Sequence, residues 1–107
     1  MATVTAASLA DGQVANSKGT IYTAAGSVIV RSWTLYNSNA ISQTANVYVK
    51  RSGSTSRQLY RFTLAQYASA TVLASGELLT LSTGDVLEAD TTTASAVDFY
   101  IGGATIA

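Results

Sequence analysis

The stretch SVIVRSWTLY, residues Ser27 to Tyr36, decides the fold class of this chain. It is rich in β-branched and aromatic side chains, which favour extended strands. Strict alternation would place on one face Val28, Val30, Ser32, Thr34 and Tyr36, and on the other Ile29, Arg31, Trp33 and Leu35. Both faces are largely apolar, which is typical of a strand in the middle of a packed sheet. The sequence therefore predicts a central strand with Trp33 in the core.

Alternating runs of the same kind recur along the chain, separated by turn residues such as Gly, Asn and Ser. Further strands are expected at Thr3–Ser8, Gly19–Ala24, Gln43–Arg51, Arg57–Leu64, Ala65–Ala74 and Val97–Ile101. We expect the strand at Gln43–Arg51 to return antiparallel, with Ala45, Val47 and Val49 on its buried face. In the last strand, Val97, Phe99 and Ile101 should point inward and Asp98 and Tyr100 outward. About eight short strands predict one antiparallel β-sandwich or jelly-roll-like domain spanning residues 1–107.

Two glycine-containing segments carry more specific expectations. At Glu77–Asp90 the runs LLTL and VLEA flank a short loop, Ser82 to Asp85, which predicts a hairpin. Near the end of the chain, Gly102 and Gly103 predict a bulge or a close approach between two backbones.

The composition argues against catalysis. The chain has no His and no Cys, so general acid, general base or nucleophilic chemistry would depend on carboxylates. The acids are Asp11, Glu77, Asp85, Glu88, Asp90 and Asp98. Glu88 and Asp90 share one strand face, as in a glycoside hydrolase, but a small sandwich offers no deep cleft and a solvated polar face is the favoured interpretation. We therefore expect no enzyme.

Cofactor, metal and membrane binding lack sequence support as well. The acids do not follow the spacing of a calcium-binding loop, and neither a P-loop nor a dinucleotide fingerprint is present. No apolar run approaches the roughly 18 residues of a spanning helix. The expected protein is a soluble module without cofactor, metal or membrane partner.

The order of charges along the chain is unusual. All six Lys and Arg residues lie within the first 61 positions, whereas five of the six acids lie from Glu77 onward. The two groups could form opposed patches that dock copies or a partner, or they could pair within one molecule. The candidate interface residues are Lys50, Arg51, Arg57, Glu77, Glu88 and Asp90. A nucleic-acid partner is not expected, because the sequence pI of about 6.0 is not basic.

Three long stretches resemble a known family. They are LADGQVANSKGTIYTA (Leu9–Ala24), WTLYNSNAISQTANVYVKRSGSTSR (Trp33–Arg57) and LTLSTGDVLEADTTTASAVDFYIGG (Leu79–Gly103). They are similar to a family of small β-sandwich proteins encoded among the structural genes of tailed bacteriophages. Its members share the patterns LxxGQLxxxKGTLYT, LxNTxxxxxTVNLYV and LxxGDxIEGxASTAxxVDYxISG. In this chain Ala89 replaces the glycine that follows the family's acidic residue.

The resemblance implies a virion component assembled in the cytoplasm of a host bacterium. The first expectation is a capsid decoration, or cement, protein that binds the major capsid protein or other virion proteins and forms a homo-oligomer. The alternative is a tail or fibre module that binds carbohydrate on the host surface. Its stacking residues would come from Tyr22, Tyr36, Tyr48, Tyr60, Tyr67 and Tyr100.

Overall fold

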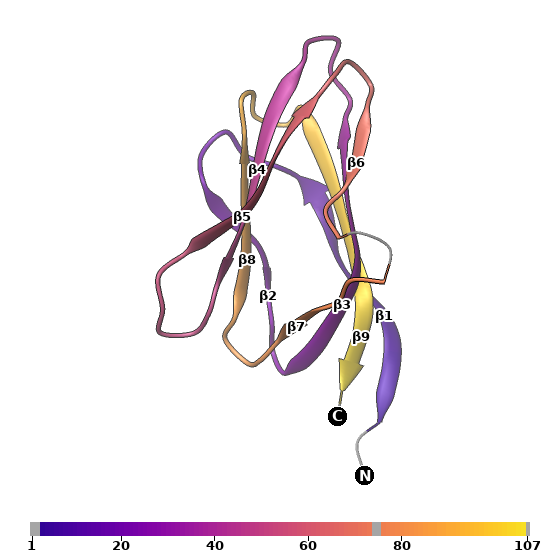
Figure 1. Ribbon diagram of the computed structural model, residues 1–107, viewed down its shortest axis with the longest axis vertical. Coiled ribbons are helices and arrows are strands. Elements are labelled where there is room, and N and C mark those ends of the chain that lie inside the picture. Colours follow the sequence, from indigo (N-terminus) through magenta and orange to yellow (C-terminus); the bar gives the residue numbers. More distant parts are fainter. Residues whose placement is uncertain (1–2, 74–75, 107) are drawn as a thin grey trace.

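The computed structural model describes residues 3–73 and 76–106, which form two antiparallel β-sheets packed face to face (Figure 1). The strands are β1 (Val4–Gln13), β2 (Gly19–Thr23), β3 (Ser27–Asn37), β4 (Gln43–Lys50), β5 (Arg57–Leu64), β6 (Ser69–Thr71), β7 (Leu79–Leu81), β8 (Val86–Thr91) and β9 (Val97–Ile106). The predicted all-β sandwich is confirmed, with nine strands in place of about eight. Of the expected strand at Ala65–Ala74 only β6 forms, and Ala74 lies outside the described residues. The described part of the chain contains no helix long and apolar enough to span a bilayer.

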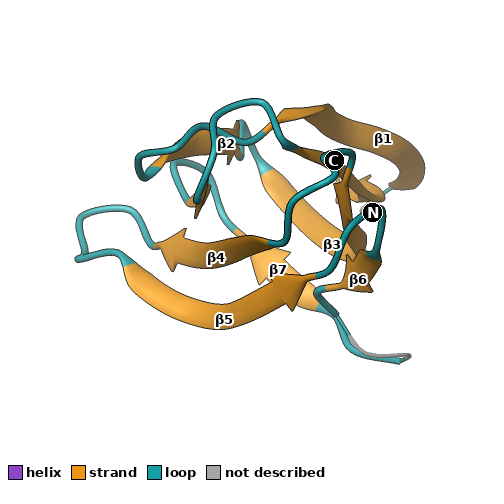
Figure 2. Ribbon diagram, turned by 90° about the horizontal axis from the view of Figure 1, so that it is seen from above, coloured by secondary structure: helices purple, strands orange, loops and turns teal. Residues whose placement is uncertain are grey.

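The strand order is that of a jelly roll. One sheet has the order β1-β9-β3-β6, with β7 also paired to β3, and the other has the order β2-β8-β4-β5. Without β7, each layer holds four strands and the chain crosses between the layers repeatedly, as in two interleaved Greek keys. Figure 2 shows the two layers, with β4 and β5 in one and β1, β3 and β6 in the other. The expected central strand is confirmed, because β3 pairs with β9 on one side and with β6 and β7 on the other.

The hairpin expected at Glu77–Asp90 is wrong. β7 pairs with β3, whereas β8 pairs with β2 and β4 in the opposite sheet. The turn from Ser82 to Asp85 therefore carries the chain from one layer to the other. β4, which follows β3 in the chain, is also in the opposite sheet, where it pairs with β5 and β8. Alternation shows which side chains of a strand face the core, but it does not say which sheet the strand joins.

The strict alternation expected along β3 is also wrong. The register of β3 against β9 shifts next to Arg31, which leaves this residue as a β-bulge. The bulge changes the face of the strand, so that Val28 and Val30 before it and Trp33 and Leu35 after it are all buried. The expected burial of Trp33 is confirmed, since this side chain is 0% exposed.

The Gly102–Gly103 pair lies opposite this bulge, and the expected close approach is confirmed. A Cβ atom on Gly103 would lie 1.9 Å from the carbonyl oxygen of Ile29 on β3. The register of β1 against β9 also shifts opposite the pair, next to Leu9. Both neighbours of β9 are therefore irregular at the point where it has no side chains.

Buried amides hold one end of the sandwich together. Asn37, 0% exposed at the end of β3, donates from Nδ2 to the carbonyl oxygens of Leu64 and Ala65, 3.0 and 3.1 Å away. The Oε1 atom of Gln43 accepts from the backbone N–H of Thr93 at 2.9 Å. These bonds tie both sheets to the loops that join them, and satisfy groups that would be costly to bury alone.

Candidate interaction surfaces

The six predicted interface residues do not form one patch. Lys50, Glu88 and Asp90 lie on the outer face of the β2-β8-β4-β5 sheet. Arg57 is exposed at the start of β5, at the margin of the same sheet. The other two, Arg51 and Glu77, lie in connecting segments that lead toward β5 and β7 respectively.

Arg51 is used inside the molecule. Its Nη1 atom lies 3.0 Å from Oδ2 of Asp85 and also donates to the carbonyl oxygen of Thr80 at 2.7 Å. Asp85 is 5% exposed and accepts from the backbone N–H groups of Ser82 and Ser52, both at 2.9 Å. These hydrogen bonds, together with the Arg51 guanidinium, lower the pKa of Asp85. Arg51 and Asp85 therefore pair within one molecule and do not face a partner.

The outer face of the β2-β8-β4-β5 sheet carries a connected set of polar side chains, here called the network face. Its centre is Asp90, which accepts from Nδ2 of Asn46 at 2.8 Å and from the hydroxyl of Tyr48 at 2.6 Å. The Oδ1 atom of Asn46 in turn accepts from Nε2 of Gln58 and Nε of Arg61, both at 2.9 Å. The network therefore joins β8, β4 and β5 across the sheet.

Further charges on the network face are also engaged. The hydroxyl of Ser56 donates to Oε1 of Glu88 at 2.6 Å, and Nζ of Lys18 lies 5.1 Å from the centre of the Tyr48 ring, within cation–π range. The hydrogen bond to Asp90, with burial and the nearby negative charge, raises the pKa of Tyr48 to about 12. Four charged side chains of this face, those of Asp90, Glu88, Arg61 and Lys18, thus have partners within the molecule.

The outer face of the β1-β9-β3-β6 sheet is different in character. Its register forms two rows across the four strands, which are Asp11–Tyr100–Thr34–Thr71 and Gln13–Asp98–Tyr36–Ser69. The five larger side chains define what we call the tyrosine face: Asp11, Gln13, Tyr36, Asp98 and Tyr100. Its two carboxylates and two phenol hydroxyls form no hydrogen bond with another described side chain or backbone group, so their bonding capacity is available to a ligand.

Tyr100 forms a platform on this face. A Cβ atom on Gly102 would lie 2.6 Å from the Tyr100 hydroxyl and 2.9 Å from its Cε2 atom, so the ring lies across the glycine. An aromatic ring that covers a glycine in this way protects the backbone beneath it. Tyr100 is 42% exposed and Tyr36, on the next strand, is 40% exposed. Alternation along β9 predicted Tyr100 on the outside, but only the register shows that Tyr36, opposite Asp98, is its diagonal neighbour on β3.

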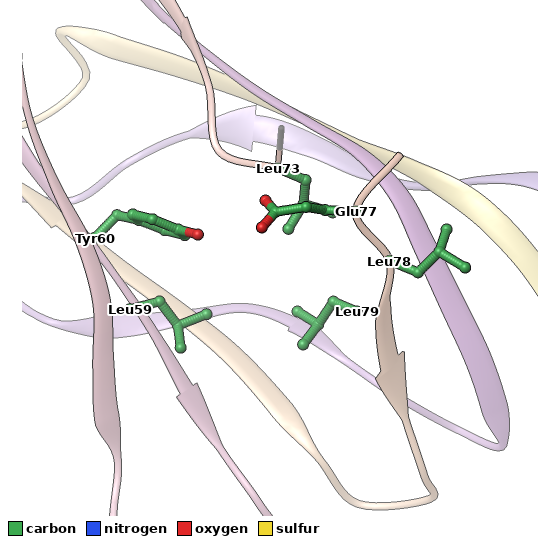
Figure 3. A pocket seen from close by; sticks show the side chains of 6 residues that line it. All are labelled: Leu59, Tyr60, Leu73, Glu77, Leu78 and Leu79. Atoms are coloured by element: carbon green, nitrogen blue, oxygen red, sulfur yellow. The ribbon is translucent and has the colours of Figure 1, made fainter. Parts of the chain in front are cut away.

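A pocket of about 250 Å³ opens at the edge of the sandwich, between β5 and the segment that leads into β7 (Figure 3). Its lining is largely apolar and consists of Leu59, Tyr60, Leu73, Glu77, Leu78 and Leu79. In Figure 3 the Glu77 carboxylate extends toward Tyr60. The sequence did not predict this pocket, because one wall comes from β5 in one sheet and the other from β7 and the segment before it, which belong to the other side of the sandwich.

The carboxylates do not assemble a recognisable chemical centre. Within residues 3–73 and 76–106, no three acidic side chains gather closely enough to hold a metal ion. Glu88 and Asp90 alternate along β8 on the network face, outside the pocket. Comparison with known proteins finds no matching family model, curated protein or solved structure. Function must therefore be inferred from the surfaces of this chain.

Proposed function

We propose that this protein is a non-enzymatic structural component of a bacteriophage virion, a capsid decoration protein that binds the major capsid protein or other virion proteins by burying surface. One observation carries the proposal: the Glu88 and Asp90 pair, which the sequence offered for catalysis, and the buried Asp85 are hydrogen-bonded within the fold. Asp85 accepts from two backbone N–H groups, Glu88 from Ser56, and Asp90 from Asn46 and Tyr48. Carboxylates occupied in this way hold strands and loops together and are poorly placed to act on a substrate.

Two further points favour this role. Jelly rolls are frequent among viral capsid and lectin domains, although the same architecture hosts many functions. The three stretches that resemble the phage family contain much of the framework found here, including Asp85 and the Gly102–Gly103 pair. A framework of turns and strands that engages Asp85, Glu88 and Asp90 in internal hydrogen bonds fits a protein that acts through its surfaces.

The test is to locate the protein in particles of the phage that encodes it. We expect quantitative mass spectrometry of purified virions to find it at a fixed ratio to the major capsid protein. Purified protein added to capsids that lack it should bind until saturation and raise their melting temperature. Its absence from purified virions would overturn the proposal.

The tyrosine face favours carbohydrate on a host surface as a second candidate ligand. Aromatic rings that lie flat on a sheet can stack on the apolar face of a sugar, while carboxylates and amides accept and donate hydrogen bonds around its rim. Tyr36 and Tyr100 supply the rings, and Asp11, Asp98 and Gln13 supply the polar groups. In this case the protein would be a tail or fibre module.

A panel of bacterial surface polysaccharides would test this candidate by isothermal titration calorimetry. We expect binding by the wild-type protein and its loss in the double variant Tyr36→Ala/Tyr100→Ala. The matched control is Tyr60→Ala, because Tyr60 is also exposed but lies on β5 in the other sheet. If the double variant binds as well as the wild type, the tyrosine face is not the site.

A further inference from the structure

β1 is an edge strand with an unprotected outer side. It is the outermost strand of its sheet and pairs only with β9 among the described strands. In Figure 1 the first half of β1 lies beside β9, close to the chain termini and away from β2. The backbone N–H and C=O groups on the outer side of this half therefore face solvent, and can pair with an additional strand.

The other sheet edges carry the features by which proteins prevent unwanted pairing. β2 has five residues, and β6 and β7 have three each, so none of them offers a long template. β5 has eight residues, but it contains Arg57 and Arg61 and its register against β4 shifts at a bulge. β1 is longer, with ten residues. Its register also shifts, next to Leu9, but the segment Val4–Ser8 pairs with β9 without a break and carries no charge.

The side chains on the first half of β1 are small or apolar. Val4 is 63% exposed, and Ala6 is also exposed. Their partners on β9 are Ile106 and Ala104, so the uncharged character continues into the sheet. A strand added at this edge would lie beside an uncharged strip of the sheet.

We propose that the occupant of this edge is the β1 strand of a second copy, paired antiparallel about a two-fold axis so that the two sheets become one. Such a pairing places the segment Val4–Ser8 opposite itself, and a segment without charge meets no like-charge repulsion there. The same arrangement at β5 would bring Arg57 and Arg61 near their own copies. The formal net charge of zero adds no repulsion between whole molecules. The inference deepens the proposed structural role by naming a partner, and it rests on strand geometry alone.

A charge-swap experiment tests the pairing. We expect analytical ultracentrifugation to show a concentration-dependent monomer–dimer equilibrium for the wild-type protein. The variants Val4→Lys/Ala6→Lys and Val4→Glu/Ala6→Glu should each raise the dissociation constant at least about tenfold, because like charges then face each other. An equal mixture of the two variants should recover dimers, since opposite charges then face each other.

The control places two lysines on another edge. Thr20→Lys/Thr23→Lys alters exposed residues of β2 and should leave the dimer unchanged. Hydrogen exchange of the wild-type protein gives a second measurement, in which amides of Val4–Ser8 should gain protection as the concentration rises. Near-ultraviolet circular dichroism of the buried Trp33 checks that every variant remains folded.

Three results would overturn the pairing: a wild-type protein that stays monomeric at all concentrations, charged variants that dimerise as tightly as the wild type, or a mixture that dimerises no better than either variant alone. A monomeric protein that is nevertheless found in virions would overturn the pairing alone. A β1-dependent dimer that is absent from virions would overturn the structural role alone.

Discussion

The outer faces of the two sheets use polar side chains in opposite ways. On the network face, Asp90 and Asn46 accept or donate four hydrogen bonds that connect three strands. On the tyrosine face, the carboxylates of Asp98 and Asp11 accept no hydrogen bond from another described group, and two tyrosine rings are exposed beside them. The comparison teaches that a similar polar composition can stabilise a sheet or remain available for binding, and that only the register decides which.

The largest expected effect concerns the core beneath both faces. Trp33→Ala should lower the free energy of unfolding by about 3–5 kcal/mol, because it removes a large, fully buried aromatic side chain. Urea denaturation followed by circular dichroism measures the loss. Trp33→Phe, which keeps most of the apolar volume, should lose clearly less. Equal losses in the two variants would mean that packing at this position does not depend on side-chain volume.

The next effect concerns the hydrogen bonds and the ion pair of Asp85, at the end of the sheet that carries the network face. Because the folded-state pKa of Asp85 is lowered, its ionised form stabilises the fold above the ordinary value of 3.8, and this stabilisation is lost as the pH falls through the folded-state pKa. Asp85→Asn should therefore melt at a lower temperature than the wild type at pH 7. The difference between the two melting temperatures should become smaller toward pH 3. A difference that does not change with pH would contradict the role of the charge.

A matched pair of carboxylates tests the comparison between the faces directly. Asp90→Ala should cost about 1–2 kcal/mol, because it leaves Asn46 and Tyr48 without their partner. Asp98→Ala should change the free energy of unfolding by less than about 0.5 kcal/mol, because no described group depends on it. Both values come from urea denaturation at neutral pH. If the two costs are equal, the distinction between the faces fails.

The smallest expected effect is the pH dependence of Tyr48. Since its pKa is raised from 10.0 to about 12, its stabilising hydrogen bond is fully present below pH 10 and is lost as the pH rises toward 12. Tyr48→Phe should therefore cost about 0.5–1 kcal/mol at pH 8 and close to nothing at pH 12. Urea midpoints measured across this range give the difference. A cost that persists at pH 12 would show that packing, and not the hydrogen bond, is responsible.

The strand pattern could be predicted well from local sequence. The alternation of Val97, Phe99 and Ile101 correctly placed them in the core, as did that of Ala45, Val47 and Val49. The reason is that successive side chains of a strand point to opposite sides whatever the strand pairs with. The Gly102–Gly103 pair was also informative, because residues without a side chain allow another backbone to come close, as Ile29 does here.

The candidate surfaces were less predictable. The order of charges suggested an interface of Lys50, Arg51, Arg57, Glu77, Glu88 and Asp90, yet Arg51 pairs with Asp85 and Asp90 with Asn46 and Tyr48 inside the chain. These partners lie more than 30 positions apart in the sequence. These pairs could not be predicted from the sequence, because strand pairing in a jelly roll brings together residues that are far apart in the chain.

By itself, then, the sequence determined the fold class, the extent of most strands and the burial of Trp33, because these follow from side-chain alternation and hydrophobicity within a few residues. Only the tertiary structure decided that β7 and β8 belong to different sheets, that Arg31 bulges so that β3 changes face, and that Tyr36 lies beside Tyr100. Each of these depends on which strands become neighbours. Sheet pairing is set by packing of the whole molecule, since the backbone groups of any strand can bond equally well to several others.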